Sequence, residues 1–85
     1  MITFEHEIKD ELGLHARPAG LLVKFASQYA SDITLQSGPK SANAKKLFQV
    51  MGLGTKGGSM LTISISGPDE QDAHIALADY LNKNI

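Results

Sequence analysis

The sequence predicts an α+β fold with two layers, in which helices cover one face of an antiparallel sheet. Four short segments alternate between apolar and polar residues, a pattern typical of half-buried strands. Three other segments carry apolar residues at helical spacing. The segments follow one another in the order βαββαβα, and strands with one polar face fit an antiparallel sheet that is covered on its other face.

The first half of the chain predicts a strand, a helix and a hairpin. Apolar residues alternate from Ile2 to Ile8 on one face of the first strand. Apolar residues at i, i+3, i+4 and i+7 predict an amphipathic helix over about residues 16–28. The alternation returns over residues 32–37, a Gly-Pro turn follows, and residues 40–43 can form a short paired strand.

The second half predicts a short helix, a strand and a final helix. The buried stripe of the short helix is expected to consist of Leu47, Val50 and Met51. The glycine-rich GLGTKGG then ends this helix and makes a turn, because it lacks the spacing of a nucleotide-binding loop. Residues 60–66 (MLTISIS) form the clearest strand. Asp69 is a good N-cap for the last helix, whose expected buried stripe is Ala73, Ala76, Leu77 and Tyr80.

Length and composition restrict the class of protein. The 85 residues fit one domain, 1–85, with a single modest core. The net charge of -1 provides no basic field for nucleic acid. The absence of cysteine excludes disulfides and thiol chemistry. The three histidines are too scattered to suggest a metal site, so we expect no metal. We also expect no cofactor.

No stretch of the sequence resembles a targeting or membrane segment. The first residues, MITFEHEIKDE, are acidic and alternating, unlike a signal or transit peptide. No apolar run approaches the roughly 20 residues that span a bilayer. We therefore expect a cytoplasmic protein without membrane insertion.

The stretch LGLHARPAG, residues 12–20, places several chemically informative residues at the start of the first helix. His15 falls at or just before the helix start, where backbone N–H groups lack intrahelical partners and the helix dipole favours negative charge. Pro18 fits an early helical turn, and Gly13 permits a tight approach just before it. These features predict an anion site, with phosphate as the favoured anion.

His15 is the candidate nucleophile of this site. A neutral imidazole has a free lone pair that can attack phosphorus. Arg17 could then pair with the phosphate oxygens as a planar fork. From the residues alone, His15 could instead be a helix cap, a loop residue or a general base, and Arg17 an ordinary surface residue. His6 and His74 fit packing or solvated positions better than functional ones.

The stretch GLHARPA within this element order resembles the HPr family, the histidine phosphocarriers of the bacterial phosphoenolpyruvate-dependent sugar phosphotransferase system. The resemblance covers nearly the whole chain, including KSANAKKLFQVMGLG around the second helix and SISGPDEQDA before the third. It implies an open-faced β-sandwich, with a four-stranded antiparallel sheet in the order 1-4-2-3 and three helices on one face.

The resemblance also implies a mechanism. In the family, phospho-enzyme I transfers a phosphoryl group to Nδ1 of the HPr histidine, and HPr passes it to a histidine of an enzyme IIA domain. By this resemblance His15 is the phosphorylated residue and Arg17 its phosphate partner, assisted by the backbone N–H groups of Ala16 and Arg17. The protein would then be a monomeric carrier with a phosphohistidine intermediate rather than a stand-alone enzyme.

The partner surface of the family lies on the first two helices, around the histidine. The corresponding residues here are Gly20 and Lys24 on the first helix, and Leu47, Phe48 and Met51 on the second. Phe48 falls off the expected apolar stripe of the second helix, so its ring is either exposed for a partner or folded onto the edge of the core.

Position 46 departs from the family pattern. Many HPr proteins carry a regulatory serine there, a target of HPr kinase/phosphorylase, but this chain has Lys46. Ser41 is nearby and does not match that position. Because lysine is a poor N-cap, we expect the second helix to begin from Asn43. A regulatory HPr-like binding module that docks on other proteins and a carrier of the nitrogen-related branch remain as alternative functions.

Overall fold

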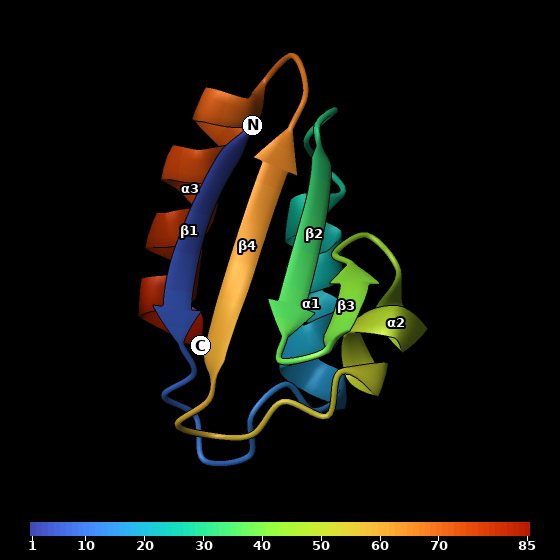
Figure 1. The fold of residues 1–85 in the computed structure, drawn as a ribbon, viewed down its shortest axis with the longest axis vertical. Helices are drawn as coiled ribbons and strands as arrows, with labels where there is room; N and C mark the ends of the chain where they lie inside the picture. The colour runs from blue at the N-terminus through green and yellow to red at the C-terminus, as the bar shows by residue number, and fades with distance from the viewer.

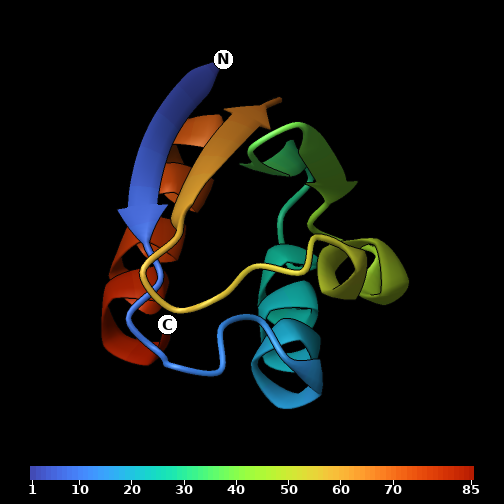
Figure 2. The same cartoon turned by 60° about the horizontal axis from the view of Figure 1, so that its bottom comes forward.

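The computed structural model describes all 85 residues and confirms the predicted fold class and element order. The strands are β1 (Ile2–Glu7), β2 (Asp32–Ser37), β3 (Lys40–Asn43) and β4 (Met60–Ser66), and the helices are α1 (Ala16–Ala26), α2 (Leu47–Gly52) and α3 (Glu70–Asn84). The strands form one antiparallel sheet in the order β1-β4-β2-β3. Helices α1 and α3 lie behind one face of this sheet (Figure 1), α2 lies on the same side, next to α1 (Figure 2), and the other face is open.

The central strand β4 shows how the residue pattern produces this architecture. Leu61, Ile63 and Ile65 are completely buried, whereas the residues between them point toward the open face. Ile63 pairs with Phe4 of β1 on one side and with Leu35 of β2 on the other. Because side chains alternate along a strand, this register places the apolar residues of neighbouring strands on the helix-covered face.

Helices α1 and α3 cover this apolar face. Ala19, Leu22 and Ala26 of α1 are fully buried as the spacing predicts, whereas Val23, the fourth residue of the predicted stripe, is only half-buried. Helix α1 ends at Ala26, two residues earlier than expected, and the Ser27 hydroxyl donates to the Val23 carbonyl at 2.7 Å. The stripe predicted for α3 is partly wrong, because Ala76 and Tyr80 are only half-buried and Leu81 is fully buried instead.

Helix α2 differs most from its prediction. Val50 is its only buried residue, while Leu47 and Met51 lie partly in solvent. The reason is the position of α2, a single short helix that packs beside α1 at the edge of the sheet (Figure 2). One side chain is enough to fill the contact that such a short helix makes.

The expected start of α2 at Asn43 is also wrong. Helix α2 begins at Leu47, with Lys46 at the N-cap position and no side-chain capping bond. Asn43 instead ends β3 and forms a turn, in which its Oδ1 atom accepts from the Lys45 N–H at 2.9 Å. The Lys46 N–H donates to the Asn43 carbonyl at 3.0 Å. This local bonding of Asn43 competes with helix formation, so the helix starts later.

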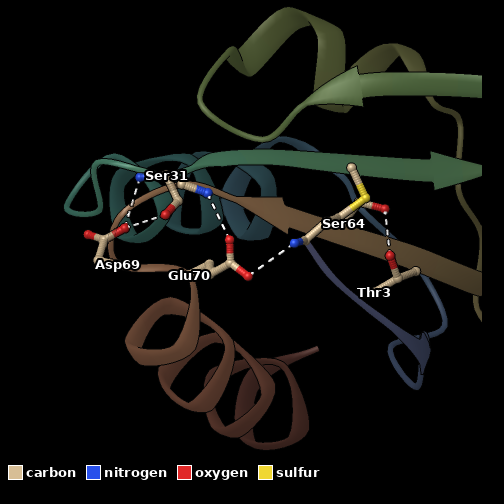
Figure 3. A network of polar contacts seen from close by, with 7 residues as sticks. Thr3, Ser31, Ser64, Asp69 and Glu70 are labelled. Atoms are coloured by element: carbon tan, nitrogen blue, oxygen red, sulfur yellow. Dashed lines mark hydrogen bonds and ion pairs between the residues drawn. The ribbon is translucent and has the colours of Figure 1, made fainter.

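A polar network joins the start of α3 to the residues just before β1 and β2 (Figure 3). Asp69 stands at the predicted N-cap position, but its carboxylate accepts from the Ser31 hydroxyl and from the N–H groups of Ala30 and Ser31. The Ser31 hydroxyl bond, followed by the Ala30 N–H, holds the pKa of Asp69 below its usual value. Glu70 accepts from the Gly67 N–H and lies 3.1 Å from the Met1 amino nitrogen.

The packing interpretation of His74 is confirmed, whereas His6 is more deeply buried than the half-buried position that its place on the apolar face of the strand predicts. The His74 ring packs against Phe4, with ring centroids 4.8 Å apart. His6 is buried at the end of β1, and its Nε2 atom has no hydrogen-bond partner. Burial, and secondarily the positive charge of Lys9, lowers the pKa of His6 from its ordinary value of 6.5. The folded protein therefore resists protonation of this ring.

We expect this burial to make stability depend on pH. As the pH falls below 6.5, His6 of the unfolded chain binds a proton before His6 of the folded chain does, so the free energy of unfolding decreases. Urea unfolding at about pH 7.5 and about pH 5 measures the decrease. The His6→Phe variant should lose less stability between the two conditions. An equal decrease in both proteins would show that His6 does not contribute.

Candidate functional site

His15 occupies the N-cap position of α1, as the sequence predicts. Its backbone is extended (φ -83°, ψ -178°), and its carbonyl accepts from the Ala19 N–H at 3.0 Å. The ring makes no capping hydrogen bond, and 40% of its side chain is exposed. The imidazole is therefore accessible from solvent, whereas a capping histidine would turn its ring onto the helix.

The first turn of α1 leaves several donors unused. The N–H groups of Ala16 and Arg17 donate to no protein acceptor, as expected for a helix start. Pro18 has no N–H to satisfy. The Arg17 side chain is exposed and forms no ion pair with a carboxylate. These donors and the positive end of the helix dipole provide a local environment that favours a phosphate group beside His15.

Two loops hold this helix start in place, residues 10–14 after β1 and residues 55–58 before β4. They lie side by side at the bottom end of the molecule (Figure 1), and the Leu14 N–H donates to the Thr55 carbonyl at 3.2 Å. At Gly13 the backbone has φ +66°, and an added Cβ would stand 2.8 Å from the Lys56 Cα and overlap the Thr55 carbonyl. The close approach predicted for Gly13 is therefore observed.

Gly57 makes the matching contact from the other loop. An added Cβ there would stand 2.7 Å from the Asp10 carbonyl oxygen and 2.9 Å from the Glu11 Cα. The sequence indicated only a turn at this glycine, because nothing in the local pattern shows which backbone will approach it. We call this pair of contacts, at Gly13 and Gly57, the glycine clasp.

The candidate partner residues lie on the two neighbouring helices. The Phe48 ring is 85% exposed, which excludes the alternative that it folds onto the core. Leu47 and Met51 are about one-third exposed, so the surface of α2 carries a group of apolar side chains. Gly20 and Lys24 lie on α1, beside α2, and a side chain at Gly20 would meet nothing.

Two further apolar residues of this region escaped the sequence analysis. Leu12 is 72% exposed in the loop before α1, and Leu21 is 52% exposed on the helix itself. Leu21 follows Arg17 by four residues, so both lie on one side of α1. Its position outside the buried stripe was the signal that could have identified it.

Comparison with known proteins identifies the family. Residues 2–83 match the family model described as the PTS HPr component phosphorylation site. The chain is 43% identical over 83 residues to the phosphocarrier protein HPr of Lysinibacillus sphaericus, covering 98% of this chain and 94% of that protein. The chain belongs to the HPr family. HPr proteins are phosphocarriers of the phosphotransferase system, which agrees with the anion site at α1.

Solved structures of the HPr family have the same fold. HPr-C-His from Thermoanaerobacter tengcongensis superposes with a TM-score of 0.92 at 39% identity, over 99% of this chain and 94% of that chain. The Bacillus subtilis catabolite repression protein Crh, a dimer with a swapping domain, superposes with a TM-score of 0.77 at 35% identity. That match covers 100% of this chain and 98% of Crh. The open-faced β-sandwich expected for the HPr family is therefore shown.

Two other features of this HPr family member bear on the site. No group of three or more histidine, aspartate or glutamate side chains is placed to hold a metal ion. None of the helices has both the length and the apolar character required to cross a membrane.

The glycine clasp should be essential for stability. We expect Gly13→Ala to reduce the free energy of unfolding by about 2 kcal/mol or more, because alanine is strained at positive φ and its Cβ collides with the facing backbone. Gly20→Ala is the control, since its Cβ meets open space and helix propensity favours alanine by about 0.5–1 kcal/mol. Urea unfolding compares the two variants. Equal stabilities would contradict the clasp.

Proposed function

We propose that this HPr family member accepts a phosphoryl group from phospho-enzyme I on Nδ1 of His15 and passes it to enzyme IIA domains. The observation that carries this proposal is the exposed, uncapped His15 ring at the N-terminus of α1. An accessible imidazole beside unused N–H donors is suited to both receiving and releasing a phosphoryl group.

The proposed transfer uses groups of this chain at each stage. The Nδ1 lone pair of His15 forms a bond to phosphorus while the phosphorus–nitrogen bond of the donor phosphohistidine breaks, and that electron pair returns to the donor ring. The N–H groups of Ala16 and Arg17 and the Arg17 guanidinium stabilise the phosphoryl oxygens. Transfer to a histidine of an enzyme IIA domain is the same step in reverse.

The proposed docking surface consists of Gly20, Lys24, Leu47, Phe48 and Met51. Exposed aromatic and apolar side chains of this kind are common anchors in protein interfaces. Phe48 supplies the largest exposed apolar side chain of α2, and its 85% exposure leaves it free to enter a partner's pocket. The absence of a side chain at Gly20 lets a partner approach α1 closely. Lys24 adds a positive charge, which suits an acidic partner.

A regulatory role is the second candidate, and the similarity to Crh, a catabolite repression protein, supports it. A regulatory module would dock on other proteins without needing a reactive histidine. The exposed His15 and the unused donors of α1 favour the carrier role. We propose a cytoplasmic monomer; a carrier of the nitrogen-related branch would share the same chemistry.

Incubation with phosphoenolpyruvate and enzyme I tests the carrier role. The intact mass of this protein should rise by one phosphate, and acid should remove it. His15→Ala should abolish the gain and change stability by at most about 2 kcal/mol, since His15 is an exposed N-cap residue. His74→Ala is the control and should be phosphorylated normally. Acid-labile phosphate on His15→Ala would exclude His15 as the acceptor.

Lys46 has a consequence for regulation under this proposal. It stands at the N-cap of α2, next to Leu47 and Phe48 of the docking surface, and its side chain is exposed. A phosphoserine at this position would bring about -1.5 to -2 of charge, whereas Lys46 brings a positive charge and offers no hydroxyl group. We therefore propose that HPr kinase does not phosphorylate this position.

Reversal of the charge at position 46 should slow transfer from enzyme I. We expect Lys46→Glu to reduce the rate roughly two- to fivefold at low salt, which corresponds to up to about 1 kcal/mol for an exposed charge interaction. The effect should shrink at high salt, because screening acts over about 10 Å at 0.1 M. Lys46→Gln should fall between wild type and Lys46→Glu. Rates that do not differ among the three proteins would place position 46 outside the docking surface.

A further inference from the structure

Asp10 is the one carboxylate that the fold places against the candidate nucleophile. Its Oδ2 atom lies 3.9 Å from Nε2 of His15, and each side chain is 40% exposed. The two residues belong to the same β1–α1 connection but are five positions apart, and the sequence pattern did not connect them. The contact involves Nε2, the ring nitrogen opposite the proposed site of phosphorylation.

The Asp10 carboxylate is held in position by its neighbours. Its Oδ1 atom accepts from the Leu12 N–H at 3.0 Å, so one oxygen is anchored while the other faces His15. The Asp10 carbonyl accepts from the Gly13 N–H at 2.9 Å, and Gly57 packs directly against that carbonyl. The glycine clasp thus fixes the backbone of Asp10 as well as the start of α1.

We propose that Asp10 is a positioning residue that keeps the His15 proton on Nε2 and leaves Nδ1 as the free nucleophilic atom. This inference rests on the proposed function, in which Nδ1 of His15 is the phosphorylated atom. In a neutral imidazole one nitrogen carries the proton and the other carries the lone pair, and the group that faces the ring selects between them. At 3.9 Å the contact is longer than a hydrogen bond, so the negative charge of Asp10 acts electrostatically and favours the tautomer with the proton on Nε2.

The same carboxylate serves both directions of transfer. When the Nδ1 lone pair forms the bond to phosphorus, the ring keeps its Nε2 proton and becomes positively charged, so the carboxylate stabilises the new charge. When the phosphoryl group leaves, the bonding electrons return to Nδ1 and the product is a neutral imidazole, because Nε2 still carries its proton. Without that proton the leaving group would be an imidazolate, which is a far poorer one.

The position of Asp10 limits its repulsion of the phosphate. It faces Nε2, whereas the phosphoryl group is attached to Nδ1 on the other side of the ring. The N–H groups of Ala16 and Arg17 and the Arg17 side chain are available to neutralise the phosphate. The pair is exposed and long, so its effect should be smaller than that of a buried aspartate–histidine pair.

The variant Asp10→Asn tests the proposal with little change to the loop. Its Oδ1 atom can still accept from the Leu12 N–H, which places the amide NH2 group, a donor, where Oδ2 faces His15. We expect the protonated nitrogen of the neutral His15 ring to shift toward Nδ1, as measured by 15N chemical shifts of the ring. Glu11→Gln, which makes the same charge change next to Asp10, is the control and should keep the wild-type tautomer ratio.

Phosphorylation by enzyme I is the second measurement. Asp10→Asn should be slower by roughly two- to fivefold, the size expected for an exposed charge interaction, while Glu11→Gln keeps the wild-type rate. A wild-type tautomer ratio in Asp10→Asn, or an unchanged rate despite a shifted ratio, would overturn the role of Asp10. If wild-type protein takes no phosphate from enzyme I, the proposed function fails, whereas the tautomer measurement still tests the contact with Asp10.

Discussion

The contact between two backbone loops at Gly13 and Gly57 is the constraint on which the site depends. The sheet and helices are connected near the start of α1 by residues 10–14 and 55–58, and these loops touch so closely that neither glycine has room for a Cβ. Leu14, which lies between this contact and His15, is buried and its N–H donates to the Thr55 carbonyl. The backbone therefore holds His15 and Asp10 in place, and the His15 side chain makes no capping bond on which the fold depends.

The fold separates the groups that provide stability from those available for chemistry. The apolar residues of β4 and the buried stripes of α1 and α3 form the core, and the polar network at Asp69 and Glu70 closes the end of the molecule from which α3 begins. His15 and Arg17 stand outside both groups and contribute no buried contact. Because the core does not need these side chains, their chemistry can be selected for phosphate transfer without loss of the fold.

Helix α2 shows how little structure the proposed docking surface requires. Its one buried side chain, Val50, attaches it to the rest of the molecule, and the helix presents Leu47, Phe48 and Met51 to solvent. An exposed apolar surface costs free energy in water, so its presence on a helix this short is better explained by a partner than by packing. Lys24 lies on α1 and Lys46 stands at the N-cap of α2, and their positive charges can guide an acidic partner toward His15.

The sequence by itself determined the fold class, the element order and the candidate site at His15, because local periodicity and helix-end chemistry depend on neighbouring residues. The helical pattern placed Phe48 off the buried stripe but left two positions open for its ring, and the structure showed that the ring is exposed. Only the tertiary structure decided which loop meets Gly13 and Gly57, and that Asp10 faces Nε2 of His15. It also showed that Asp69 binds Ser31 rather than capping α3 and that α2 begins at Leu47. These features depend on segments far apart in the chain or on competition among nearby hydrogen bonds, neither of which periodicity records.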